Sequence, residues 1–558
     1  MPEPDRKQVL TDEVHVSGRP GPGGRLRCVL LFPNEYAVAM PNLGFQTLYR
    51  LLNSHPEITC ERAFWPPVPD AGARFKTYSR AGFQPANAVL DGYGTPSSAR
   101  SRPGRLRSLE TATPLAGFDV VGISSSFELD WLRIPPALEA GGVPPLAAER
   151  TERDPLVLIG GPAVTGNPEP IAELADALFI GEIEGVFPDL AETLLATRGG
   201  QSSRLGGMTV PASLDALGSI PGCYVPSRPL DGAVHRAVAA DLETCETRSE
   251  IITPHAEFPR SFLIEVGRGC PRGCRFCLAR QIYQPFRTRS LDALTATARL
   301  GREFTDQFGL VGAAVADHPD LASLANAIVA MGGRVSTSSL RAERVTPELV
   351  DSLAASGQRS ITLAPETADE RLAERIGKQI SREAIHAAIR AAVEVGIVGI
   401  KLYFMVGLPG ETDAEAVGIA DYVAELQDEF PRARFTVSVD QLIPKAHTEL
   451  ARIAVPEPGA MRARLRAVGR ALKAGTRARA RLGSARWAAV QVVLSRGGRE
   501  LTPVLLDAAH RGGGAAEFIA ALRAEGLRLD DYLGPQHGDA PWEVVDLCPT
   551  SAGEARDG

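Results

Sequence analysis

Three cysteines at the spacing CxxxCxxC constrain this chain more than any other feature of its sequence. Cys270, Cys274 and Cys277 follow the apolar residues 262–266, which predict a buried strand. The cysteines therefore lie on a loop at a strand's carboxyl end, where α/β folds place their active sites. Three such thiolates favour a soft metal. A closed zinc site takes four ligands, and this loop has no fourth Cys or His, whereas three cysteines on an iron–sulfur cluster leave one iron open.

This spacing, with Phe276 directly before the third cysteine, resembles the signature of the radical S-adenosylmethionine (SAM) superfamily. The resemblance implies a [4Fe–4S] cluster on Cys270, Cys274 and Cys277, whose open iron binds the amino and carboxylate groups of SAM. It also implies that one electron cleaves SAM to methionine and a 5′-deoxyadenosyl radical. A zinc site or a chance grouping of thiols is the alternative.

The composition indicates a globular protein of several domains. The chain has 558 residues, and 44% of them are hydrophobic and 23% charged. Its net charge of −7, without a long basic run, gives no electrostatic case for general binding of nucleic acid. The start has no signal-peptide core and no apolar run is long enough to span a membrane. We therefore expect a cytoplasmic protein without a membrane partner.

The remaining cysteines do not form a second motif. They are scattered, so we expect buried or free thiols in a reducing compartment; they are Cys28, Cys60, Cys223, Cys245 and Cys548.

Residues 25–225 alternate strands with helices, which predicts a Rossmann-like, doubly wound parallel sheet. The predicted strands cover residues 27–32, 58–63, 118–124, 155–159 and 177–180. Residues 1–24 are polar and rich in Pro and Gly, so a flexible tail is expected there. Residues 66–108 interrupt the pattern as a flexible surface insertion. A basic contact to RNA or protein is the alternative for that insertion.

Two segments of this domain, GGPAVTGNPEP (160–170) and ALFIGEIEGVFPDL (177–190), resemble loops of the B12-binding domain that precedes many radical SAM domains. The resemblance implies cofactor contacts for Gly160, Gly161, Gly181 and Glu182, which would lie under the corrin or around its nucleotide tail. The D-x-H-x-x-G motif, which supplies a histidine ligand in the classical cobalamin fold, is missing from the sequence. It is commonly missing from B12-type radical SAM enzymes as well. A Rossmann-like domain without a cofactor is the alternative.

A linker is predicted over residues 226–260, and a partial (β/α)6 barrel of the TIM type over 261–450. The barrel strands are predicted at residues 262–266, 310–316, 334–338, 360–364, 397–406 and 435–439. A mostly helical cap is predicted over 451–558, beginning with a long Arg-rich helix at 459–482. Lys401 and Tyr403 alternate with apolar residues on the fifth strand, so either side chain can look into the barrel and touch a substrate.

Residues at the ends of the barrel strands match the chemical groups of SAM. Asp317 follows the second strand and suits the ammonium, and Arg341 follows the third and can hold the carboxylate through a bidentate fork. Glu366 can accept hydrogen bonds from the ribose hydroxyls or the ammonium. The backbone near Phe276 and the turn that begins at Gly407 can flank the adenine. Each charged residue is alternatively a cap or a member of a surface ion pair.

Segments 363–377, 490–499 and 541–546 resemble an uncharacterised family of radical SAM proteins with an N-terminal B12-binding-like domain. We therefore predict a radical SAM enzyme, and more specifically a cobalamin-dependent methyltransferase acting on unactivated carbon. One alternative is a cobalamin-independent radical SAM enzyme that modifies RNA, a peptide or a small molecule. Another is a non-catalytic iron–sulfur protein. The resemblance also implies an electron donor such as flavodoxin or ferredoxin, while the sequence does not identify the substrate.

Overall fold

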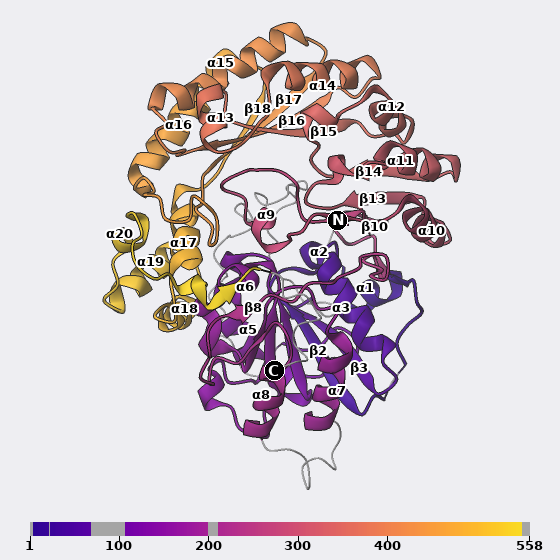
Figure 1. Ribbon diagram of the computed structural model, residues 1–558, viewed down its shortest axis with the longest axis vertical. Helices are drawn as coiled ribbons and strands as arrows, with labels where there is room; N and C mark the ends of the chain where they lie inside the picture. Colours follow the sequence, from indigo (N-terminus) through magenta and orange to yellow (C-terminus); the bar gives the residue numbers. More distant parts are fainter. Residues whose placement is uncertain (1–3, 22, 69–105, 199–209, 549–558) are drawn as a thin grey trace.

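The computed structural model describes residues 4–21, 23–68, 106–198 and 210–548, and shows an α/β domain beneath an open barrel (Figure 1). The α/β domain is built on a six-stranded sheet in the order β3-β2-β4-β5-β6-β7, parallel except for β7. The strands are β2 (Leu26–Phe32), β3 (Ile58–Phe64), β4 (Val120–Ser124), β5 (Leu156–Gly160), β6 (Ala177–Phe179) and β7 (Cys223–Tyr224). The predicted parallel sheet is confirmed.

These strands are apolar along most of their length because helices cover both faces of the sheet. One face packs on α3 (Leu43–Ser54), α7 (Phe187–Arg198) and α8 (Val210–Gly218). The other face packs on α5 (Ile134–Gly141) and on helices from the end of the chain. The strand order reverses between β2 and β4, so the loops that follow these two strands border a topological switch point, the usual ligand position in such sheets.

Residues 4–21 do not form the predicted flexible tail. Helix α1 (Arg6–Asp12) is capped by the Asp5 side chain, and β1 (Val14–His15) pairs with β9 (Ile251–Ile252). The buried Glu13 carboxylate lies 2.8 Å from Arg62 of β3. Burial alone would raise the pKa of Glu13, but Arg62 and neighbouring hydrogen bonds hold it well below its usual range. The polar composition of this segment predicted a flexible tail. The segment is ordered because Arg62, far along the chain, neutralises the buried charge of Glu13. Most of the predicted insertion at 66–108 lies outside the described residues.

The barrel contains seven parallel strands in the described part of the chain, one more than predicted. A sheet β10-β13-β14 and a sheet β15-β16-β17-β18 are joined by a parallel bridge between Leu340 and Leu363. The strands are β10 (Ser261–Glu265), β13 (Gln307–Val311), β14 (Arg334–Thr337), β15 (Ser360–Glu366), β16 (Gly399–Val406), β17 (Arg434–Gln441) and β18 (Arg479–Leu482). They form an open arc, so the predicted partial barrel is confirmed (Figure 1).

Helices cover the outside of this arc, and their apolar faces share one core with the strands. They are α10 (Leu291–Arg302), α11 (Leu321–Ala330), α12 (Pro347–Ala355), α14 (Arg382–Glu394), α15 (Asp413–Glu429) and α16 (Pro458–Gly475). The predicted Arg-rich helix is therefore too long, because α16 ends at Gly475 and β18 follows. Arg and Ala alternate in residues 477–481, and this pattern fits the two-residue period of a strand as well as the 3.6-residue period of a helix. The predicted second strand also ends early, at Val311.

The helical end of the chain packs on the N-terminal domain. Its helices are α17 (Ala485–Arg496), α18 (Leu501–His510), α19 (Ala515–Ala524) and α20 (Leu529–Leu533). Val490, Val504 and Phe518 from this region are fully buried in the core that also holds β4 and β5. The short strand β19 (Val545–Asp546) pairs with β8 (Val234–His235) in the predicted linker. No helix within the described ranges is long and apolar enough to cross a membrane.

Candidate functional site

The three cysteines lie on a loop held at its base by a short antiparallel ribbon. Strand β11 (Gly267–Arg268) pairs with β12 (Arg287–Thr288), and the loop between them carries the cysteines and α9 (Leu278–Ile282). Helix α9 lies between the barrel arc and the N-terminal domain (Figure 1). All three thiols are free; Cys274 is buried, and Cys270 and Cys277 are partly exposed. The predicted ligands therefore sit where the two domains meet.

Backbone contacts fix the conformation of this cysteine loop. Gln284 Nε2 donates a hydrogen bond to the Cys270 carbonyl at 2.9 Å. The backbone N–H of Arg275 donates to the Ile376 carbonyl, also at 2.9 Å. Gly377 has φ +70°, and a Cβ there would lie 2.4 Å from the Gly273 carbonyl oxygen. Only glycine fits so close to another backbone, so the turn at 376–377 supports the loop directly.

The chemistry of the three thiols is compatible with an iron–sulfur cluster. Among the described residues, no three His, Cys, Asp or Glu side chains converge on one metal position. The cysteines are nevertheless close: burial foremost raises the pKa of Cys277, and Cys274 and Cys270 add to that increase. An iron–sulfur cluster takes each thiolate on a different iron, so its ligands need not share one point. The donor set therefore fits a cluster held by Cys270, Cys274 and Cys277.

Asp317 is not available to bind an ammonium group as predicted. Its side chain is 2% exposed, with Arg272 Nε at 3.2 Å and Arg344 Nε at 3.1 Å. The two guanidinium groups already neutralise this carboxylate. Asp317 instead ties the cysteine loop to the end of the second strand. The neighbouring His318 is buried, with Nε2 2.9 Å from the Arg289 carbonyl oxygen, and is structural too.

Arg341 keeps free hydrogen-bonding capacity next to the cysteine loop. Its side chain is 15% exposed, and Nη2 donates to Glu343 Oε1 at 3.0 Å and to the Gln379 carbonyl at 3.3 Å. Its buried Nε has no partner within the described residues, and neither does the buried hydroxyl of Thr337 at the end of β14. Buried donors without partners cost free energy. The end of β14 therefore offers donors to an anionic ligand; sequence reasoning missed Thr337.

Glu366 forms an ion pair that the sequence did not suggest. Its carboxylate lies 2.9 Å from Nζ of Lys378, a residue only 8% exposed. Burial opposes the charge of Lys378, but Glu366 and then Cys274 raise its pKa overall. Glu366 also has φ +69° at a register shift in β15, a conformation that costs a non-glycine residue free energy. Lysine is rare in this chain, and this rarity was the one sequence signal that could have marked Lys378 as a candidate site residue.

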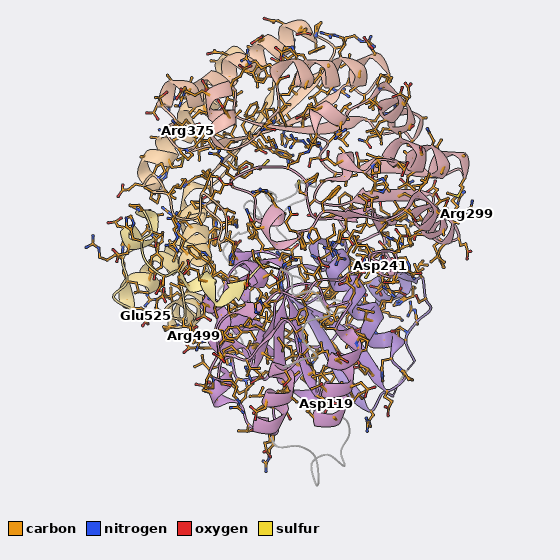
Figure 2. All side chains as sticks on the ribbon, in the orientation of Figure 1. Asp119, Asp241, Arg299, Arg375, Arg499 and Glu525 are labelled. Carbon is orange, nitrogen blue, oxygen red and sulfur yellow. The ribbon has the colours of Figure 1, made fainter. Side chains whose placement is uncertain are left out.

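Phe276 and the turn that begins at Gly407 lie next to each other. Phe276 packs on a small apolar cluster that includes Leu408 of this turn; its other members are Leu372, Ile376, Leu442 and Leu450. Gly407 has φ +82°, and its N–H donates to Glu411 Oε2 at 2.5 Å. Arg375, labelled in Figure 2, donates from Nη1 to the Pro409 carbonyl at 2.9 Å. The two groups predicted to flank an adenine thus share one apolar cluster.

Of the four N-terminal residues predicted to contact a cofactor, Glu182 is buried, and Gly160, Gly161 and Gly181 are partly exposed. A Cβ on Gly161 (φ +119°) would lie 2.3 Å from the Ser125 carbonyl oxygen, and one on Gly181 (φ +110°) would lie 2.2 Å from that of Ala237. Close packing of backbones therefore explains both glycines. A Cβ on Gly160 would make only ordinary contacts, with Phe179 at 3.4 Å.

Glu182 holds the domains together. It is 4% exposed and lies 2.6 Å from Arg287 Nη2 and 3.2 Å from Arg268 Nη1. Both arginines belong to the ribbon at the base of the cysteine loop. The carboxylate therefore anchors that ribbon to the N-terminal domain, a contact that the sequence reading missed.

The carboxyl edge of the N-terminal sheet faces the cysteine loop (Figure 1). Helix α6 (Pro162–Gly166), which follows β5, packs on α9, and a Cβ on Gly166 would lie 3.1 Å from Leu278 Cδ2. Polar side chains join the two loops at the switch point. Asn34 Nδ2 donates to Asp130 Oδ1 at 3.0 Å, and Asn42 Nδ2 donates to Ser126 Oγ at 2.8 Å. A ligand at this edge would lie beside the cysteine loop.

Comparisons with known proteins agree with this architecture. The family model described as the radical SAM superfamily matches residues 264–423, and the model described as radical SAM proteins, N-terminal, matches residues 94–226. An uncharacterised protein of Methanocaldococcus jannaschii is 30% identical over 442 residues, which cover 79% of this chain and 90% of that protein.

Two solved structures share parts of the fold at low sequence identity. One is the structure of the radical SAM methyltransferase TsrM from Kitasatospora setae with cobalamin and a [4Fe–4S] cluster bound. It is 15% identical to this chain with a TM-score of 0.47, and the match covers 76% of this chain and 74% of that one. The other is the structure of the cobalamin-dependent SAM radical enzyme OxsB with aqua-cobalamin and SAM bound. It is 16% identical to this chain with a TM-score of 0.46, and the match covers 72% of this chain and 52% of that one.

Proposed function

This chain belongs to the radical SAM superfamily, with a Rossmann-like α/β domain before the barrel, and on that premise we propose that it cleaves SAM reductively. Cys270, Cys274 and Cys277 would hold a [4Fe–4S] cluster. When both are bound, the cluster and SAM supply a 5′-deoxyadenosyl radical. The observation that carries this proposal is the set of three free thiols on a loop fixed beside the unsatisfied Nε of Arg341.

The residues around the cysteine loop would bind and orient SAM. Arg341 Nε and the Thr337 hydroxyl would donate hydrogen bonds to its carboxylate. Glu366 would accept from the ammonium or the ribose, and Lys378 holds the Glu366 carboxylate in place. Phe276 and the turn at Gly407 would flank the adenine. Asp317 takes no part in this binding, because two arginines already occupy its oxygens.

Substitution of Arg341 tests this arrangement. We expect Arg341→Ala to weaken equilibrium binding of SAM to the reconstituted protein by about tenfold or more, the value of a charge-assisted hydrogen bond. Arg334→Ala is the matched control, since this exposed arginine begins β14, the strand that precedes Arg341, and its guanidinium pairs only with Asp306 among the described residues. Unchanged SAM affinity in Arg341→Ala would refute the assignment of the carboxylate site.

The finer proposal is a cobalamin-dependent methyltransferase acting on unactivated carbon. Its support is the switch point between β2 and β4, which has polar side chains at Asn34, Asn42 and Ser126 and lies on the sheet edge that faces the cysteine loop. Bound methylcobalamin would supply the methyl group. The partly exposed backbone of Gly160, Gly161 and Gly181 would contact the corrin or its nucleotide tail, whereas the buried Glu182 holds Arg287 and Arg268.

Reconstitution with hydroxocobalamin tests this finer proposal. We expect the protein to keep the corrin through desalting, seen in its visible spectrum, and to show less corrin after Asn42→Leu. Deoxyadenosine formation without retained corrin would instead indicate a cobalamin-independent radical SAM enzyme. A cluster without SAM cleavage would indicate a non-catalytic iron–sulfur protein. In the catalytic cases we propose a flavodoxin or ferredoxin as the electron donor and the cytoplasm as the location.

A further inference from the structure

The strands β16, β17 and β18 present a polar face to the interior of the barrel. Alternate residues of these strands, such as Leu402, Phe404 and Val437, are fully buried in the core shared with the outer helices. The intervening residues therefore point the other way. Five of them carry polar or charged groups and are partly exposed; they are Lys401, Tyr403, Thr436, Asp440 and Arg481. We call this set the inner face.

Strand register places the two cations of the inner face near each other. Tyr403 of β16 pairs with Ser438 of β17, which pairs in turn with Arg481 of β18. Lys401 lies two residues before Tyr403 on the same face. Neighbouring strands are about 4.8 Å apart, so the long side chains of Lys401 and Arg481 can bring their charges together across β17. Burial, and after it Arg481, lowers the pKa of Lys401.

The two cations have no ion-pair partner in the part of the chain that the structure describes. Two further charged side chains lie near them on this face. Asp440 acts on Tyr403 and has other contacts of its own. Arg479 is exposed and lies in register with Lys401 across Thr436, so it adds a third positive charge to this face. Two partly buried like charges repel each other and lose hydration. An anion bound between them would relieve both costs. The Tyr403 hydroxyl is a suitable third donor: burial raises its pKa to about 12, so it keeps its proton.

We propose that the inner face binds a carboxylate or phosphate group of an organic substrate, held by Lys401, Arg481 and the Tyr403 hydroxyl. Arg481 would offer its planar fork and Lys401 a point charge. The site lies inside the barrel, on strands whose carboxyl ends lead to the cysteine loop side of the molecule. Identification of the bound molecule as substrate rests on the proposed SAM chemistry, whereas the anion site itself does not.

Calorimetric titration of the reconstituted full-length protein with inorganic phosphate and with acetate tests this site. We expect saturable binding to the wild type and a loss of about tenfold or more in affinity for Lys401→Gln and for Arg481→Gln. Arg466→Gln is the control, because Arg466 is exposed on α16, outside the barrel. Tighter binding of phosphate than of acetate would identify a phosphorylated substrate, and the reverse a carboxylic acid. No binding to the wild type, or equal binding to all variants, would overturn the proposal.

Lysine labelling of the unmodified chain gives a second measurement that needs no variant to fold. The chain has only six lysines, so acetylation of each can be followed by mass spectrometry. Phosphate or acetate at saturation should slow acetylation of Lys401 about fivefold or more, while Lys473, exposed on α16, should react as before. Equal effects on the two lysines would contradict the site.

The same preparations are assayed for 5′-deoxyadenosine. Its absence from the wild type would refute the proposed function and leave the anion site to be decided by titration and labelling alone. Its presence in all variants, together with lost anion binding in Lys401→Gln and Arg481→Gln, would support both.

Discussion

Arg272, inside the cysteine loop, forms an ion pair with Asp317, just beyond the second barrel strand, with Arg272 Nε 3.2 Å from Asp317 Oδ2. Arg344 contacts the same carboxylate from the segment after the third strand. A single side chain, 2% exposed, thus joins three segments around the cysteines. The cysteine loop is therefore positioned by side chains as well as by its backbone contacts to the turn at 376–377.

Asp317→Asn should loosen the cysteine loop without removing a SAM contact. The change leaves two arginines without their carboxylate, at a cost of about 1–3 kcal/mol in stability. We expect less iron retained after desalting, with SAM affinity per cluster close to that of the wild type. Asp306→Asn, in an exposed pair with Arg334, is the control. A fall in SAM affinity with full iron content would mean that Asp317 binds SAM after all.

Lys378→Met should separate SAM binding from cluster binding. Without the ammonium, the Glu366 side chain, which is 13% exposed, loses its partner at 2.9 Å. We expect SAM affinity to fall by about tenfold, with iron content unchanged, as measured by equilibrium binding and iron analysis. Lys473→Met removes an exposed lysine as the control. Wild-type affinity in Lys378→Met would exclude the Glu366–Lys378 pair from the SAM site.

Lys445→Met should change how the stability of the junction between the domains depends on pH. Lys445 Nζ lies 2.6 Å from Glu128, a carboxylate that also accepts hydrogen bonds from Gln491 and Ser495 of α17. Burial would raise the pKa of Glu128, but Lys445 foremost lowers it overall. In the wild type, this stabilisation is present above the unfolded pKa of about 4.3 and is lost as pH falls through the lower folded value.

At pH 7 the variant should be about 3 kcal/mol less stable than the wild type, since it buries an unpaired carboxylate. The difference should shrink as pH falls toward about 4.3, because without Lys445 burial raises the pKa of Glu128 and the carboxyl takes up a proton in the folded variant above its unfolded pKa. Below about 4.3 the wild type loses its own stabilisation as well. Urea unfolding at several pH values measures both, with Lys473→Met as the control. A difference that does not depend on pH would show that Glu128 does not carry it.

Gly161→Ala should unfold the N-terminal domain more readily whether or not a cofactor binds there. The new Cβ would meet the Ser125 carbonyl oxygen at 2.3 Å in a backbone conformation with φ +119°. We expect a loss of about 2 kcal/mol or more from strain, seen as a lower thermal midpoint without cobalamin. Gly418→Ala on α15, where a Cβ would have nothing within 4 Å, should be neutral or stabilising. A wild-type midpoint for Gly161→Ala would show that close packing does not require this glycine.

Local sequence patterns predicted the secondary structure and the parallel sheets, which depend on residues that are close along the chain. The apolar residues before Cys270 predicted a strand, and the parallel sheets followed from alternating strands and helices. Contacts between distant residues were out of reach. Glu182 is a charged residue in a loop, where exposure to solvent is expected, yet it is buried in ion pairs with Arg268 and Arg287. Periodicity in the sequence does not encode tertiary contacts. Three further features depend on such contacts: the order of the strands, the packing of α17 to α19 on the N-terminal sheet, and the pairing of β1 with β9.

Formation of 5′-deoxyadenosine tests the central claim most directly. The protein is reconstituted anaerobically with iron and sulfide, desalted, and given SAM and a chemical reductant. We predict an iron–sulfur spectrum and deoxyadenosine in the wild type, loss of both in Cys270→Ser, Cys274→Ser and Cys277→Ser, and neither loss in Cys548→Ser, which changes an exposed cysteine elsewhere. Deoxyadenosine formation that survives substitution of the three cysteines, or a wild type that holds a cluster and binds SAM but does not cleave it, would contradict the account.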